Sequence, residues 1–444
     1  MIGREKSIEI VKKVLSMSGA DQTEALLMGG ESYLTGFANN YIHRNVGEKN
    51  YTLSVRVVMG KRIGSSSVDD FSDEAIKKVI QDAMLIAENQ QENPDFVSLA
   101  KPEKAEDKEF FIKDTAECSP DFRAEYVNKI LKATKAKGLT GSGKFETNAM
   151  EIAIANSLGV ERYTKLTTST LKSVVLSDTS SGYSMSSSID VNKIPVDDIL
   201  KESIEIAEMG KNPTSIEPGK YEVILTPYAL AELISHLNYL ALNARAMKEG
   251  TSFLIGQIGK KVVGENVTMY DDGLSSETIP LPFDFEGVSK RKVVFFEKGI
   301  AKNVVYDTLT AYKEGKESTG HSLPQPNPYS PYPMNVIMEG GKSSKEEMIS
   351  NVKRGLYVQR FWYTNPMDPR RAIITGMTRD GLFLIENGKI TRPVKNMRFT
   401  ESVINVLNNI IELSKDKKIV YDMSSITVPY ARIKEFTFTS KTEF

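Results

Sequence analysis

The sequence contains three histidines, His43, His236 and His321, and these are the first residues to test for metal chemistry. Zinc hydrolases that hold their metal on a helix place two histidines about four or five residues apart, with a glutamate beside the first as general base. No two of the three histidines are that close in this chain. A local zinc motif is therefore excluded, and only a site assembled from distant histidines and carboxylates stays open.

The chain offers little for nucleophilic catalysis. The elbow motif G-x-S-x-G of serine hydrolases does not occur. Cys118 is the only cysteine, and its acidic neighbour Glu117 disfavours the thiolate that a nucleophile needs. A single cysteine also excludes an intrachain disulfide and a thiolate metal cluster.

One stretch imitates a phosphate-binding loop. Residues 138–145, GLTGSGKF, match G-x-x-x-x-G-K, but Phe145 stands where that loop needs a Ser or Thr to reach magnesium. We expect a helix before this stretch and strand-like residues after it, whereas the loop needs a strand before and a helix after. A nucleotide site is not expected here.

The composition is that of an ordinary globular protein with two or three domains. The 57 basic and 58 acidic residues nearly cancel, and the lysines are dispersed rather than grouped in a stripe that could neutralise phosphates. The apolar runs are far shorter than the roughly 20 residues that cross a bilayer, and the N-terminus has no signal-like apolar core. We therefore expect a cytoplasmic protein with neither a nucleic-acid nor a membrane partner.

The pattern of expected helices and strands predicts an α+β fold. Residues 1–215 mix helices and strands as N-terminal α/β lobes of about 1–92 and 118–212, joined by an exposed, charged linker at 93–117. Apolar spacing predicts an amphipathic helix from Arg4 to Met17. Ser72 is predicted to cap a second helix.

The C-terminal half is predicted to be richer in strands. After the boundary at Pro213 to Gly219, residues 220–444 begin with a long helix predicted over Pro227 to Met247. Many short strands with turn signals follow, which indicates a β-sandwich or partly closed barrel. The aromatic run 361–363, Phe-Trp-Tyr, fits either the core or the cover of a cleft or partner surface.

Several motifs in the C-terminal half carry a family resemblance. They are the segment GTSFLIGQIGKKVVGENVTMYDDG from Gly250, FDFEGV at 283–288, EKGI at 297–300, STGH at 318–321, and IENGKI at 385–390 with Pro393 and Val394. Together they resemble the TldD/PmbA family, whose PmbA side is also called TldE, over roughly residues 20 to 410. The STGH segment is similar to the TldE side.

The resemblance implies where a zinc site would stand. Catalytic members of the family carry H-E-x-x-x-H on the helix before G-T-S, and a later cysteine completes the site. Aligning the G-T-S turns without a gap places Ser235, His236 and Leu240 at the His, Glu and second His positions. A one-residue slip leaves Leu237 and Ala241 at the last two positions, and no cysteine follows Cys118. The resemblance therefore implies no metal in this chain and zinc in a TldD-like partner.

The resemblance also implies a function. The family works as a heterodimer of a zinc-bearing TldD-like subunit and a metal-free TldE-like subunit, which enclose a chamber where unfolded or small peptides are cut. This chain is similar to the second kind, and the family also carries the label modulator of DNA gyrase. By the matching motifs, we expect Gly250, Thr251, Ser252 and His321 to line or support the peptide cleft.

Two alternatives stay open from the sequence. The chain could be a stand-alone peptidase whose metal site is assembled from distant residues. It could instead be a homodimeric module that binds peptides without catalysis. Metal content, cleavage and oligomeric state distinguish the three hypotheses.

Overall fold

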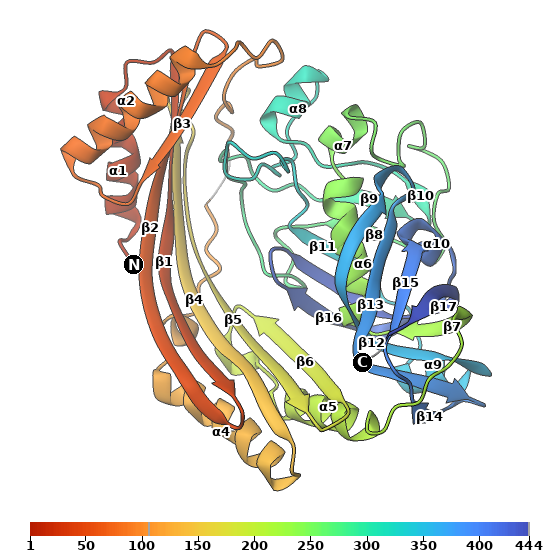
Figure 1. The fold of residues 1–444 in the computed structure, drawn as a ribbon. Coiled ribbons are helices and arrows are strands. Elements are labelled where there is room, and N and C mark those ends of the chain that lie inside the picture. Colours follow the sequence, from red (N-terminus) through yellow and green to blue (C-terminus); the bar gives the residue numbers. More distant parts are fainter. Residues whose placement is uncertain (105–106, 443–444) are drawn as a thin grey trace.

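The computed structural model describes residues 1–104 and 107–442 and has two β-sheets with helices packed on them (Figure 1). Residues 105–106 of the predicted linker 93–117 and residues 443–444 of the predicted C-terminal domain lie outside the described residues. The predicted α+β class is confirmed. Within the described ranges, no helix has both the length and the apolar character needed to cross a membrane.

The first sheet has six antiparallel strands in the order β3-β2-β1-β4-β5-β6. The strands are β1 (Gln22–Ala38), β2 (Tyr41–Met59), β3 (Arg62–Val68), β4 (Thr140–Asn156), β5 (Glu161–Leu176) and β6 (Ser181–Ser188). Figure 1 shows the long strands as a curved wall beside the second half of the chain. Asn39 and Asn40 join β1 to β2 with φ angles of 52° and 62°, the left-handed backbone of a two-residue type I′ turn.

The helices of this half are α1 (Arg4–Met17), α2 (Asp73–Asn89), α3 (Lys113–Ala116), α4 (Pro120–Ala136), the 3-10 turn η1 (Val191–Lys193) and α5 (Val196–Met209). Ser72 caps α2, as predicted, because its side chain accepts a hydrogen bond from the Ala75 backbone N–H. In Figure 1, α1, α2 and α4 lie on the side of the wall that faces away from the second half. The other face of the wall is thus left to contact the second half.

The second sheet has eleven strands and mixes parallel with antiparallel pairs. They are β7 (Gly219–Leu225), β8 (Met269–Asp271), β9 (Val293–Glu297), β10 (Ile300–Ala301), β11 (Asn335–Met338), β12 (Arg354–Asp368), β13 (Ile373–Glu386), β14 (Lys389–Pro393), β15 (Met397–Ser402), β16 (Ile410–Tyr421) and β17 (Ser425–Lys441). The strand order β17-β15-β13-β12-β7 closes on itself because β7 also pairs with β17. This ring forms the partly closed barrel of the C-terminal half.

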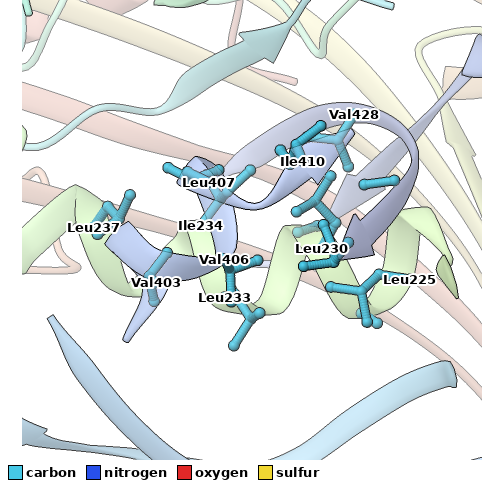
Figure 2. Packing of buried hydrophobic residues seen from close by; sticks show 14 of the residues in the cluster. Leu225, Leu230, Leu233, Ile234, Leu237, Val403, Val406, Leu407, Ile410 and Val428 are labelled. Atoms are coloured by element: carbon cyan, nitrogen blue, oxygen red, sulfur yellow. The ribbon is translucent and has the colours of Figure 1, made fainter. Parts of the chain in front are cut away.

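The helices of this half are α6 (Pro227–Leu240), α7 (Ala244–Lys248), α8 (Thr308–Lys313), α9 (Lys345–Ser350), the 3-10 turn η2 (Pro369–Arg371) and α10 (Val403–Asn408). Figure 2 shows α6 packed against α10 through Leu233, Leu237 and Val406 among others. Most α6 residues are buried, which fits a helix that is apolar on nearly all sides. The largest hydrophobic core of the chain therefore fixes the position of α6.

The predicted helix from Pro227 to Met247 is wrong in one respect, because it is two helices. Asn243 ends the first: its side-chain amide donates to the backbone oxygens of Asn238 and Tyr239. The same side chain accepts from the Ala246 N–H and so caps α7. One asparagine thus satisfies the end of α6 and the start of α7, and it separates them.

Candidate functional site

The C-terminal half of α6 meets β12 in a line of hydrogen-bonded polar side chains. His236 Nδ1 lies 2.7 Å from the Tyr239 hydroxyl, and Nε2 lies 2.9 Å from Thr364 Oγ1. The Thr364 hydroxyl also donates to the Glu232 carboxylate. Since that hydroxyl proton is directed at Glu232, the imidazole donates from Nε2 and accepts from Tyr239 at Nδ1. We call Glu232, His236, Tyr239 and Thr364 the α6–β12 site.

Burial keeps the imidazole neutral. His236 is 7% exposed, and burial lowers its pKa from 6.5 to about 4. Both ring nitrogens are engaged with hydroxyl groups. At neutral pH the imidazole therefore bridges α6 to β12 as an uncharged group.

A β-bulge brings Thr364 to this site. Trp362 pairs with Met377 and Asn365 pairs with Thr375, so Tyr363 and Thr364 together lie opposite Gly376. Tyr363 takes a φ of 54°, a left-handed conformation that is uncommon for a bulky residue. A Cβ on Gly376 would lie 2.8 Å from Thr364 Cγ2, so glycine makes room for the bulge.

Beside the bulge, large apolar side chains are exposed. Trp362 is 41% exposed, Tyr363 69% and Tyr329 61%. The Arg379 guanidinium lies 4.2 Å from the Trp362 ring centroid, and Tyr239 and Tyr329 meet edge to face at 6.4 Å. We call the exposed residues Tyr329, Trp362, Tyr363 and Met367 the aromatic rim. Tyr329 contacts Tyr239 of the α6–β12 site, Trp362 and Tyr363 directly precede Thr364, and these residue types are enriched at protein interfaces.

The predicted cleft residues Gly250, Thr251 and Ser252 lie at the end of α7. The Thr251 and Ser252 N–H groups both donate to the Ala246 carbonyl, and the Ser252 hydroxyl donates to the Ala241 carbonyl. The Gly250 carbonyl accepts from Arg370, in the connection between β12 and β13. The G-T-S turn thus closes the helix end and contacts the strand connection next to the rim. Its role toward a peptide stays a prediction.

His321, the fourth predicted residue, lies elsewhere and is fully buried. Its Nε2 is 3.0 Å from Asp271 Oδ1, and its Nδ1 is 3.0 Å from the Thr319 hydroxyl. Burial lowers the pKa of His321, and the nearby Lys290 adds to that effect. In this position His321 can support a cleft but cannot line one.

The FDFEGV turn joins the two halves of the chain. Arg56 of β2 donates to Glu24 of β1 at 2.9 Å and to Glu286 of the turn at 3.0 Å. Burial raises the pKa of Glu24 to about 7 even though Arg56 lowers it, and burial together with Glu286 raises the pKa of Asp284. We call Glu24, Arg56, Asp284 and Glu286 the joint cluster.

The remaining residues with candidate chemistry are not brought to the α6–β12 site. His43 is exposed on β2, and Cys118 is buried, which raises the pKa of its thiol. In the aromatic run 361–363, Phe361 packs in the core while the next two residues are exposed. Throughout residues 1–104 and 107–442, no group of three or more His, Cys, Asp or Glu side chains is placed to hold a metal ion.

The three positions that align with a zinc motif do not fit a zinc ion. The Ser235 hydroxyl donates to the Glu232 carbonyl within the helix, at 2.7 Å. Both nitrogens of His236 are bound to hydroxyl groups. Leu240 is 6% exposed and packs in the main hydrophobic core. Each of the three side chains is therefore engaged within the fold, either by hydrogen bonds or by packing in the core.

Comparisons with known proteins identify the family. The model described as PmbA/TldA metallopeptidase C-terminal domain matches residues 218–440, and the one described as PmbA/TldA metallopeptidase domain 1 matches residues 23–87. The chain belongs to the PmbA/TldD family. This confirms the resemblance drawn from the sequence motifs.

Curated relatives of this PmbA/TldD chain are distant in sequence. An uncharacterized protein of Methanocaldococcus jannaschii is 25% identical over 378 residues, which cover 82% of this chain and 84% of that protein. Metalloprotease PmbA of Escherichia coli O157:H7 is 25% identical over 384 residues, covering 82% and 81%. A metalloprotease TldD homolog of Buchnera aphidicola is 30% identical over 233 residues, covering 51% and 47%.

Solved structures share the PmbA/TldD fold over nearly the whole chain. TldE from Thermococcus kodakarensis superposes with a TM-score of 0.87 at 23% identity and covers 98% of this chain and 100% of that one. A Bacteroides thetaiotaomicron protein, described as a "putative modulator of DNA gyrase", superposes with a TM-score of 0.86 at 20% identity and covers 99% and 100%. These similarities establish the fold.

Three members of the α6–β12 site are not found by sequence reasoning. Glu232 and Tyr239 stand four residues before and three after His236, so all three share one helix face, and that spacing is visible in the sequence. Thr364 is 128 residues away from His236 along the chain. Only the bulge on β12 brings Thr364 to α6, and no sequence motif marks it.

Proposed function

We propose that this chain is the non-catalytic, TldE/PmbA-like subunit of a TldD/TldE-type metallopeptidase heterodimer in the cytoplasm. The proposal rests on the contacts of three side chains of α6. Ser235, His236 and Leu240 stand where catalytic relatives carry zinc ligands and base, and each is engaged by the fold itself. Zinc and the general base then belong to the TldD-like partner.

The aromatic rim is the proposed contact for that partner. Binding energy at protein interfaces is concentrated in Trp, Tyr and Arg side chains, and the rim offers Trp362 stacked under Arg379 together with Tyr363 and Tyr329. The rim borders the α6–β12 site and the G-T-S turn. A partner docked there would face the region where this family holds its catalytic helix.

The chain also contributes to the peptide chamber in this proposal. Unfolded or small peptides would bind in extended form along strand edges by main-chain hydrogen bonds. Gly250, Thr251 and Ser252 would hold the connection between β12 and β13 beside the rim, and His321 would support the second sheet through Asp271 of β8. Cleavage that is unchanged by Thr251→Ala in the assembled pair would remove this residue from the proposal.

The direct experiment compares the chain alone with the assembled pair. We expect the lone chain to purify without stoichiometric zinc and to leave an unfolded peptide uncut, and we expect cleavage after a TldD-like chain is added. The matched control is the same partner with the glutamate of its H-E-x-x-x-H changed to glutamine. Zinc at one equivalent with cleavage by the lone chain would contradict the proposal.

The single tryptophan gives a second, independent readout. Trp362 is the only tryptophan of the chain and belongs to the rim. Labelling it as 5-fluorotryptophan gives one ¹⁹F resonance, which we expect to shift when the partner binds. A resonance that stays unchanged in a complex proven by size would place the partner elsewhere.

A further inference from the structure

Part of β2 lacks a neighbouring strand on one side. β1 pairs along β2 with a bulge at His43, whereas β3 pairs only with the stretch from Leu53 to Met59. Residues 41–52 of β2 therefore form an open edge of the first sheet, with most side chains exposed and no strand of the described residues beside them. In Figure 1 this edge is the outer margin of the curved wall. We call residues 41–52 the open edge.

Open strand edges present unpaired main-chain groups, and proteins usually cover or disrupt them. The other edge of this sheet, β6, packs against β13 and β16 of the second sheet. The open edge contains no proline and most of its side chains are exposed, but a bulge at His43 interrupts its register near one end. Its main-chain donors and acceptors are thus available to another extended chain.

The charges on the open edge are only partly used within the chain. Lys49 lies 3.5 Å from Glu31 on β1. Arg44 forms no ion pair with any described residue, and Glu48 only accepts a long hydrogen bond from the Asn50 side chain at 3.4 Å. One cation and one anion, four residues apart, therefore lack a charged partner.

We propose that two copies of this chain pair antiparallel along the open edge, about a two-fold axis through Val46. In this register Arg44 of each copy lies opposite Glu48 of the other, so the symmetry creates two opposite-charge pairs. Val46 lies opposite its own copy on the axis, which gives an apolar contact between the two charge pairs. The result is one continuous sheet of two walls.

Other symmetric registers are worse. Facing residues of an antiparallel pair point to the same face of the sheet, so the two-fold axis passes through a residue and not between two residues. An axis at Asn45 would place Arg44 opposite Val46 and leave its charge without a partner. With the axis at Gly47, Arg44 would lie opposite Asn50 and Glu48 opposite Val46, so neither charge would face a charge. With the axis at Val46, Arg44 lies opposite Glu48. The charge pattern thus selects a second copy in one register, whereas a peptide of arbitrary sequence has no such preference.

This pairing is independent of the proposed heterodimer, since it uses neither α6 nor the aromatic rim. One pair of strands buries less than the roughly 1,600 Å² of a standard interface, so we expect a weak, concentration-dependent dimer. Failure of either proposal leaves the other standing. The homodimer is tested on the chain alone.

Disulfide trapping tests the register in the full-length chain. We use a Cys118→Ala background so that only the introduced thiols react. Val46→Cys should give a covalent dimer on mild oxidation, because directly opposite residues have Cβ atoms within disulfide reach. Lys49→Cys lies on the same edge three residues beyond the axis, so its two copies stand roughly 20 Å apart, and it is the matched control that should not cross-link. Equal cross-linking of both variants, or of neither, overturns the proposal.

Charge reversal tests the pairing in solution by analytical ultracentrifugation. Glu48→Arg and Arg44→Glu should each be monomeric at concentrations where the unmodified chain dimerises. Mixing the two variants should restore a dimer, as should the double variant with both changes. A parent chain that is monomeric at every concentration overturns the proposal. So does protection of the open-edge amides by an added extended peptide without self-association, which would assign the edge to peptides.

Discussion

The α6–β12 site and the joint cluster each contain a buried polar side chain, and these two side chains differ in charge. In the first, hydroxyls satisfy both nitrogens of the buried, neutral His236. The second holds Glu24 and Glu286 on a single guanidinium, Arg56. Neutral hydrogen-bonded groups can lie beside a partner surface at little cost, whereas a buried charge requires its counter-charge in place.

The residues that carry the family motifs differ from the residues of the α6–β12 site. The FDFEGV turn that carries the family resemblance is the joint between the two sheets, since Glu286 reaches Arg56 and Phe283 packs with Ile152 of β4. The residues at the catalytic helix position form no motif at all. The motifs of this chain thus mark its scaffold.

The largest effect should come from removing the central charge of the joint. Arg56→Met leaves Glu24 and Glu286 buried without a cation, and we expect the free energy of unfolding to fall by about 3–5 kcal/mol. Urea denaturation measures it. Adding Glu24→Gln and Glu286→Gln to the same variant should recover much of the loss. A loss below about 1 kcal/mol would mean that the joint is not held by charge.

The two regions should respond to pH with opposite signs. Glu24 has its pKa raised to about 7, so the folded state holds a proton that the unfolded state has lost, and stability falls as pH rises from about 5 to 7. His236 has its pKa lowered to about 4, so its contribution is lost as pH falls from about 6.5 to 4. Each effect is on the order of 1–3 kcal/mol.

Urea midpoints between pH 4 and pH 8 separate the two contributions. Glu24→Gln should flatten the loss of stability toward pH 7 and leave the acid side unchanged. His236→Gln should do the reverse. Identical pH profiles for the two variants would contradict the distinction between a charged and a neutral region.

A smaller effect is expected from the bridge between α6 and β12. Thr364→Val removes the hydroxyl that joins His236 to Glu232, leaving the buried imidazole and the half-buried carboxylate without that partner, and should cost about 1–3 kcal/mol. Thr364→Ser keeps the hydroxyl and should cost less. Thermal unfolding of the two variants measures the difference, and equal losses would show that the methyl group matters rather than the hydrogen bond.

The smallest effect on stability should come from the rim. Trp362→Ala should change the free energy of unfolding by less than about 1 kcal/mol, yet weaken binding of a TldD-like partner at least tenfold, or about 1.4 kcal/mol. Leu85→Ala on α2 is the control, because Leu85 is also exposed but belongs to the first half. Equal affinity of both variants would move the partner contact away from the rim.

Local sequence patterns predict the elements that local chemistry determines. The helix from Arg4 to Met17 is found with those bounds, and Ser72 caps α2 as predicted. The first half of β2 has no strand signal in the sequence, because most of its side chains are exposed and show no alternation of apolar and polar residues.

The sequence predicts only part of the candidate site, because the rest depends on contacts between residues far apart in the chain. The resemblance to the family motif predicts that Ser235, His236 and Leu240 stand at the positions of the zinc ligands and the base. The engagement of His236 by Thr364 depends on a bulge opposite Gly376, which is a property of two paired strands. The burial of His321 against Asp271 likewise depends on tertiary packing.

We propose that this chain is the metal-free member of a peptidase pair. The most direct measurement is metal content and peptide cleavage of the purified chain, alone and after addition of a TldD-like chain. We predict less than stoichiometric zinc and no cleavage for the lone chain, and cleavage by the pair that depends on the partner's glutamate. One equivalent of zinc with cleavage by the lone chain would contradict the account.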